Sequence, residues 1–71
     1  MTSHEVGDLI RRTRREQSLR QDQLAAAAKV GVRFLVELEK GKPTAQIGKV
    51  LAVLAALGCK VTIQPPAVLS A

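Results

Sequence analysis

The side chains best suited to chemistry in this sequence lie within residues 32–42, where charged and small apolar residues recur at helical spacing. Arg33 is the most informative, because an arginine fork matches guanine O6 and N7 and discriminates that base by about 1 to 3 kcal/mol. Val36 could meet a thymine methyl group, and Glu37 could accept from a cytosine amino group or pair with Arg33 at i,i+4. The spacing predicts a helix. As the second helix of a helix-turn-helix, it could lie in the DNA major groove with this face toward the base edges.

The positions beside these residues favour contacts with the DNA backbone. Val32, Lys40 and Lys42 lie near the helix ends, where groove edges and phosphates would be. Catalysis is not expected, because His4 is the only histidine and Cys59 the only cysteine. No intrachain disulfide or Cys/His zinc cluster is possible, and no glycine-rich phosphate loop is present. We expect no enzyme activity, no cofactor and no metal.

The charge balance points to the same class of partner. The chain carries 11 lysines and arginines against 6 acidic residues, a formal net charge of +5, as expected of a nucleic-acid binder. Phe34 is the only aromatic residue, so unpaired bases have no platform on which to stack, and Phe34 itself is expected to pack against the fourth helix or a partner subunit. Duplex DNA is therefore favoured over single-stranded RNA.

The length of 71 residues allows one small domain, which buries only about 60% of the surface that its unfolded chain exposes. Without a disulfide or a metal, oligomerisation is the remaining source of stability, and we expect a homodimer. The first residues lack the apolar core of a secretory signal, and the uncharged run 50–59 is about half of a membrane span. A cytoplasmic protein without a membrane segment is expected.

Three short helices must position the outward residues. The first is expected from Ser3, its cap, to about Gln17, the second from about Gln21 to Ala28, and the third from about Val32 to Lys40. Their inward residues are Val6, Leu9, Ile10 and Thr13, then Leu24, Ala25 and Ala28, then Leu35 and Leu38. The outward Arg11, Arg12 and Arg15 form either a solvated face, with Asp8 and Arg12 paired, or a phosphate contact.

A fourth helix and an extended segment complete the expected domain. Pro43 and Thr44 are expected to open this helix with Thr44 as its cap, and Gly41 and Gly58 to end the third and fourth helices. The expected buried stripe of the fourth helix is Ile47, Val50, Leu51, Leu54 and Leu57. Residues 1–58 then form the DNA-binding domain.

The segment after the fourth helix alternates in the manner of a strand. Apolar and polar positions exchange along Cys59, Lys60, Val61, Thr62, Ile63 and Gln64, and two prolines follow. A lone strand in a helical chain has no partner, so we expect residues 59–64 to pair with a second copy as a dimerisation strand. An unpaired extended tail is the alternative. Residues 65–71 are expected to form a flexible tail.

A family resemblance is carried by residues 9–41, a helix, a turn, a second helix and a glycine stop. This part resembles the Xre (Cro/C1) regulators, with matches at Ile10, Arg11, Arg14, Leu19, Gln21, Leu24, Ala25, Ala28, Val30, Leu35, Leu38, Glu39 and Gly41. The run GVRFLVELEKGKPTAQIGKVLAVLAALGCKVTI is similar to HipB-type antitoxins. The resemblance implies an all-α, lambda-repressor-like domain of four helices, to which the expected C-terminal strand would add pairing across a homodimer.

The resemblance also implies residue roles. Arg14 and Glu39 would form a structural ion pair, since a lone charge on an inner edge is costly. Gln21 would contact a DNA phosphate, and the alternative is an ordinary exposed glutamine. Arg20 departs from the Ser, Thr or Asn that caps this helix in the family, yet its side chain could reach a phosphate of the DNA backbone. Lys29 stands where the family has glycine, so the tight turn is expected to move to Gly31.

Three functions follow as expectations. The first is a dimeric repressor that binds an inverted-repeat operator in a promoter, and the HipB resemblance adds the role of an antitoxin. Such a protein restrains a HipA-like serine/threonine kinase toxin and autoregulates its own operon. The alternatives are a stand-alone Xre-type repressor and a protein-interaction adaptor that binds no DNA.

Overall fold

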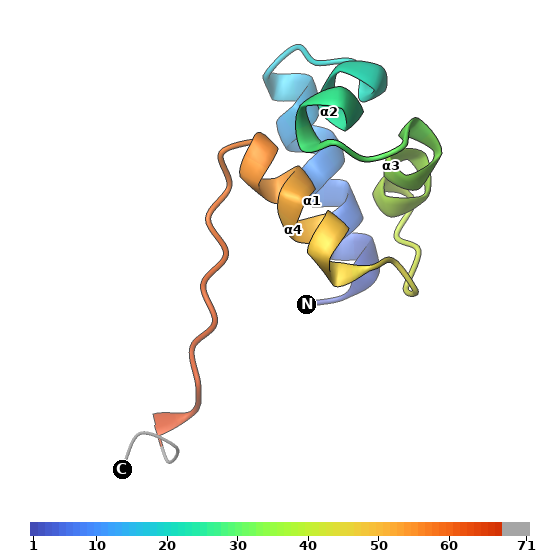
Figure 1. Cartoon of the computed structure of the whole chain (residues 1–71). Coiled ribbons are helices and arrows are strands. Elements are labelled where there is room, and N and C mark those ends of the chain that lie inside the picture. Colours follow the sequence, from blue (N-terminus) through green and yellow to red (C-terminus); the bar gives the residue numbers. More distant parts are fainter. Residues whose placement is uncertain (68–71) are drawn as a thin grey trace.

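The computed structural model describes residues 1–67 and contains four α-helices. These are α1 (Ser3–Glu16), α2 (Gln21–Ala28), α3 (Val32–Glu39) and α4 (Ile47–Ala56). They form one helical body, from which the chain after α4 runs out as an extended segment (Figure 1). The all-α prediction is confirmed, and no helix among the described residues is long and apolar enough to cross a membrane.

The core is built where α2 meets its neighbours. α2 packs against both α3 and α4, and α1 packs against α3. One large side chain from each helix is fully buried: Ile10, Leu24, Leu35 and Val53. The inward residues predicted for α2 and α3 are all buried, whereas Leu9 of α1 is 39% exposed. The core therefore holds α3 on the surface of the body with one face inward and the other free.

The N-terminus of α1 begins with a capping box one residue before the predicted cap. The Thr2 hydroxyl accepts from the Glu5 amide at 3.1 Å, and the Glu5 carboxylate accepts from the Thr2 amide at 3.0 Å. Ser3 is therefore the first helical residue and not the cap. Two otherwise orphaned amides gain partners in this way.

Gly7 sets how closely α1 approaches α3. A Cβ atom at this position would lie 2.9 Å from the carbonyl oxygen of Glu39 and nearer still to that of Leu38. Only a residue without a side chain lets the backbone of α1 lie against the last carbonyls of α3. The close contact brings the charged faces of these two helices together.

α4 differs from its prediction in both its start and its buried face. It begins at Ile47 with Gln46 at the N-cap, so Pro43 and Thr44 lie in the preceding turn. Ile47 is 74% exposed, whereas Val53, which was not expected inside, is fully buried. Leu51, also assigned to the buried stripe, is 45% exposed, while Leu54 and Leu57 are buried and Val50 is half-buried as expected. Because α4 is apolar over most of its circumference, its contact with α2 selects the inward face.

Each helix ends in the same hydrogen-bonded motif, in which a left-handed residue follows the last turn. Gly41 at φ 89° and Gly58 at φ 77° end α3 and α4 as predicted. Ser18 at φ 58° and Lys29 at φ 59° end α1 and α2. At the second of these, the Val30 amide donates to the Ala25 carbonyl at 3.0 Å, the six-to-one bond of a Schellman motif.

The prediction that the tight turn moves to Gly31 is therefore wrong. Gly31 has an ordinary φ of −71° and is the N-cap of α3. The left-handed residue is Lys29, directly after α2. The two backbone bonds that close the end of α2 offset the strain of a non-glycine residue there. α3 starts at Val32, and Lys40 is its C-cap.

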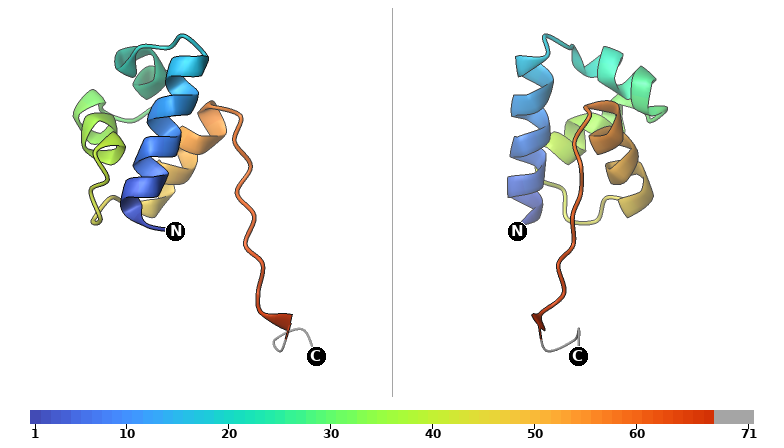
Figure 2. Two further views of the ribbon diagram at one scale, coloured as in Figure 1. Left: turned by 180° about the vertical axis from the view of Figure 1, so that it is seen from behind. Right: turned by 90° about the vertical axis from the view of Figure 1, so that its left-hand side faces the viewer.

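The predicted C-terminal strand is not present. No strand occurs within residues 1–67, and the chain from Lys60 to Pro66 carries no regular secondary structure. Figures 1 and 2 show this segment leaving the end of α4 and running clear of the helical body. A strand is defined by hydrogen bonds to a neighbouring strand, which one copy of this segment does not provide. Of the predicted flexible tail, residues 68–71 lie outside the described residues.

Candidate nucleic-acid interface

A buried ion pair joins α1 to α3 beneath the outward face of α3. Arg14 donates from Nε to Glu39 Oε2 at 2.7 Å and from Nη2 to Oε1 at 3.0 Å, and its Nη1 donates to the Leu19 carbonyl at 2.8 Å. The two side chains are 10% and 4% exposed. The hydrogen bonds to Glu39 raise the pKa of Arg14. The predicted pair is present, and its nearly buried side chains fix the orientation of α3.

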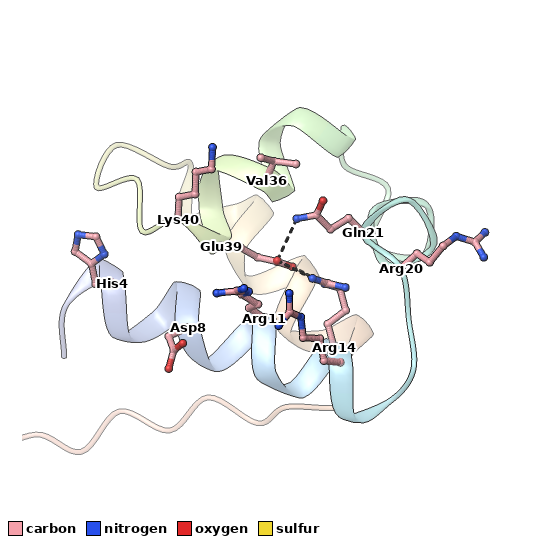
Figure 3. Close-up of a pocket in the computed structure, with 10 residues that line it drawn as sticks. His4, Asp8, Arg11, Arg14, Arg20, Gln21, Val36, Glu39 and Lys40 are labelled. Atoms are coloured by element: carbon pink, nitrogen blue, oxygen red, sulfur yellow. Dashed lines mark hydrogen bonds and ion pairs between the residues drawn. The ribbon is translucent and has the colours of Figure 1, made fainter.

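Gln21 at the start of α2 belongs to the same network. Its Nε2 donates to Glu39 Oε1 at 3.2 Å, so the side chain points at the ion pair (Figure 3). One amide hydrogen of Gln21 is therefore engaged within the protein. The expected contact between Gln21 and a DNA phosphate stays a prediction. The network connects α1, α2 and α3 through a single carboxylate.

Arg20 precedes α2 and points away from this network (Figure 3). It pairs with Asp22, Nε to Oδ1 at 3.0 Å, and its side chain is 72% exposed. The hydrogen bond from Arg20 lowers the pKa of Asp22. Gln23 Oε1 accepts from the Arg20 amide at 2.8 Å, which is one half of a capping box, whereas the arginine side chain offers no oxygen to the first amides of α2. The Arg20 side chain therefore stays on the surface and does not cap α2.

The outward face of α3 presents one cation that is held only loosely. The Arg33 side chain is 94% exposed, and its Nε lies 3.5 Å from Glu37 Oε1. The other oxygen of Glu37 accepts from Lys42 Nζ at 2.6 Å. The hydrogen bond from Lys42 is the main cause of a lowered pKa at Glu37, and the charge of Arg33 lowers this pKa further. Lys42 therefore neutralises this carboxylate, and Arg33 remains able to reach a ligand beyond the surface.

The remaining predicted residues of α3 flank Arg33. Val32 is 45% exposed, Val36 is half-buried, and Lys40 is exposed at the end of the helix. Phe34 is half-buried against the core, with the Lys49 ammonium of α4 5.5 Å from its ring centroid. Its predicted packing role against α4 is confirmed, and the face of α3 carries no aromatic ring.

A hollow of about 820 Å³ lies between α1 and the predicted interface. Its lining includes six residues that the sequence placed in the site or its supporting pair: Arg14, Arg20, Gln21, Val36, Glu39 and Lys40. Four residues of α1 complete it: His4, Asp8, Arg11 and Arg15. Their spacing of four, three and four residues marks one helix face. That spacing was visible in the sequence, but only the packing of α1 on α3 assigns this face to the site.

The comparisons with known proteins agree with this geometry. Residues 10–64 match the model of the Helix-turn-helix family. The chain is 60% identical over 65 residues to an uncharacterized HTH-type transcriptional regulator, y4mF, of Sinorhizobium fredii, an alignment that covers 92% of this chain and 86% of that protein. The fold and the outward face of α3 define the class of helix-turn-helix proteins. The chain belongs to that family, the family of HTH-type regulators.

Proposed function

We propose that this protein is a transcriptional repressor that binds an inverted-repeat operator in duplex DNA as a homodimer. The observation that carries the proposal is Arg33, 94% exposed on a helix whose orientation is held by the buried Arg14–Glu39 pair. A reading helix must be both accessible and rigidly held, since base contacts depend on its register in the major groove. The proposed role is binding and not catalysis, and the protein would act on DNA in the cytoplasm.

The proposed reading follows from the chemistry of the outward face. Arg33 donates to guanine O6 and N7, and Val36 contacts a thymine methyl group. Glu37 serves to orient Arg33, because Lys42 already neutralises its carboxylate at 2.6 Å. The flanking residues position the helix on phosphates and groove edges: Arg20, Gln21, Val32, Lys40 and Lys42.

The homodimer is proposed from the apolar surface that one copy leaves exposed. Val61 and Ile63 on the extended segment are 53% and 87% exposed, and Ile47 of α4 is 74% exposed. Two antiparallel copies of residues 59–64 would pair their backbones and cover these side chains. Two reading helices about 34 Å apart would then enter successive major grooves.

The finer role we propose is that of an antitoxin, on the basis of the resemblance of residues 31–63 to HipB-type proteins. The protein would bind a HipA-like serine/threonine kinase toxin and repress the operon that encodes both. A stand-alone repressor is the second candidate, and a DNA-free adaptor the third. An exposed cation on the outward face of α3 favours DNA binding over the adaptor.

Selection of bound duplexes from a random DNA library tests the repressor. We expect the wild type to enrich an inverted repeat, and Arg33→Ala to lose discrimination at one position of each half-site. Arg12→Ala is the matched control, since Arg12 pairs with Asp8 at 2.9 Å on α1, and it should enrich the same sequence. No enrichment by the wild type at low salt would contradict the proposal and favour the adaptor.

Co-purification tests the antitoxin role separately. The tagged chain, expressed with a kinase encoded by a neighbouring gene, should recover that kinase in a stable complex and inhibit its phosphorylation activity. Operator binding without capture of such a kinase would make the protein a stand-alone repressor.

A further inference from the structure

The arginines of α1 divide into two pairs with different surroundings. Arg12 pairs with Asp8, Nε to Oδ2 at 2.9 Å, and Arg14 pairs with Glu39 at 2.7 Å. Arg11 and Arg15 have no acidic partner within 4.0 Å among residues 1–67. Both are exposed, and both line the hollow beside α3. They are the cations of α1 whose charge is not compensated within the described part of the chain.

The hollow that receives them is positively charged. Its two carboxylates are already neutralised, Glu39 by Arg14 and Asp8 by Arg12. Its other wall adds the exposed Lys40. Figure 3 shows Arg11 extending from α1 on the side of Glu39, while Val36 and Lys40 lie on α3 above it. A surface of this composition attracts anions, and the volume of the hollow, about 820 Å³, suits a polymer better than a small ion.

The position of the hollow indicates which anion binds there. It adjoins the start of α2, at Gln21, and the outward face of α3, at Val36. When a reading helix lies in the major groove, the element before it crosses the sugar-phosphate backbone. The backbone on that flank would therefore pass the face of α1 that carries Arg11 and Arg15. These two side chains stand one helical turn apart, about 6 Å along the axis, so each can reach a different phosphate.

We propose that Arg11 and Arg15 bind backbone phosphates of duplex DNA beside the base pairs that α3 reads. α1 is then a third element of the interface, which contributes affinity without sequence preference. The inference rests on the proposed DNA-binding function and deepens it. Arg12, one position away, takes no part, because it is paired with Asp8.

The salt dependence of operator binding tests this assignment. The apparent affinity for the selected operator is measured by fluorescence anisotropy between 50 and 200 mM salt for Arg11→Gln, Arg15→Gln and the double variant. Each lost phosphate contact lowers the slope of log affinity against log salt by about 0.9. The slope of the double variant should therefore be smaller by about 1.8. Its deficit in affinity relative to the wild type should shrink about 12-fold as the salt rises fourfold, from 50 to 200 mM.

The control is Asp8→Asn/Arg12→Gln, which removes another guanidinium of α1 together with the carboxylate that it neutralises. We expect its slope to match that of the wild type, and Arg11→Lys/Arg15→Lys to retain the wild-type slope. Circular dichroism melts establish that every variant is folded at the assay temperature. The bases preferred by the double variant should be unchanged, because phosphate contacts carry no sequence information.

The outcomes separate this inference from the function on which it rests. A wild type that binds its operator while the double variant keeps the full salt slope overturns the assignment and leaves the repressor intact. An equal loss of slope in Asp8→Asn/Arg12→Gln also overturns it, since the loss of any guanidinium from α1 would then have the same effect. A wild type that binds no specific duplex removes both proposals.

Discussion

Replacing Arg14 by alanine tests whether the buried pair holds α1 and α3 together. The guanidinium and carboxylate are 10% and 4% exposed and share hydrogen bonds of 2.7 and 3.0 Å. Arg14→Ala leaves Glu39 with one side-chain donor, the Gln21 amide at 3.2 Å. Breaking a buried pair from one side costs about 3 to 5 kcal/mol, because a buried charge remains without compensation.

That loss is large for a domain of this size. A 71-residue chain has a free energy of unfolding of about 4 to 11 kcal/mol, taking about 0.05 to 0.15 kcal/mol per residue. A loss of 3 kcal/mol lowers Tm by about 12 to 24 °C, at about 4 to 8 °C per kcal/mol. Thermal and urea unfolding, followed by circular dichroism at equal protein concentrations, measure both quantities. The concentrations must be matched because the proposed dimerisation would add to stability.

The matched variant separates the uncompensated charge from lost packing. Arg14→Ala/Glu39→Gln replaces the orphaned carboxylate with a neutral amide of the same shape, so it should be more stable than Arg14→Ala alone. The reasoning is refuted if Arg14→Ala unfolds within about 1 kcal/mol of the wild type, or if the double variant is no more stable than the single one. The base preference of the operator should be unchanged, and an altered preference with stability intact would make Arg14 a base reader.

Three further predictions concern the backbone and the helix caps. Gly7→Ala should cost about 1 to 3 kcal/mol of unfolding free energy by pushing α1 from the last carbonyls of α3; Gly48→Ala, where nothing lies within 4 Å, should be neutral or stabilising, and equal Tm losses would contradict this. Lys29→Gly should raise the unfolding free energy by up to about 1 kcal/mol, because glycine relieves the strain of a left-handed φ of 59°. The greater entropy of glycine in the unfolded chain offsets part of that gain. A lower Tm would argue against strain at Lys29. The amide of Thr2 lowers the pKa of Glu5 below 4.5, so this carboxylate adds stability above about pH 4.5 that is lost as the pH falls through its folded pKa. In Glu5→Gln, the urea midpoint of unfolding should therefore depend less steeply on pH in the acid range than in the wild type. An equally steep dependence on pH would count against the capping box.

Much of the site was predictable because it depends on side-chain type and helical period. Arg33 could be placed outward and Leu35 inward from their spacing alone, and both placements hold. The partnership of Arg14 with Glu39 followed from the family resemblance and is present. The contribution of Arg11 and Arg15 was left open between solvent and phosphate, because helical period cannot say which neighbour a face will meet.

The sequence by itself determined the number and order of the helices, both ends of α2, and the glycine stops after α3 and α4. These features rest on local propensity, capping and a period of 3.6 residues, which act within a few residues of each other. Tertiary structure alone decided the buried face of α4, the close contact at Gly7 and the hollow that joins α1 to α3. Each of these depends on contacts between elements distant in the chain, where several arrangements satisfy the local rules and packing selects one of them.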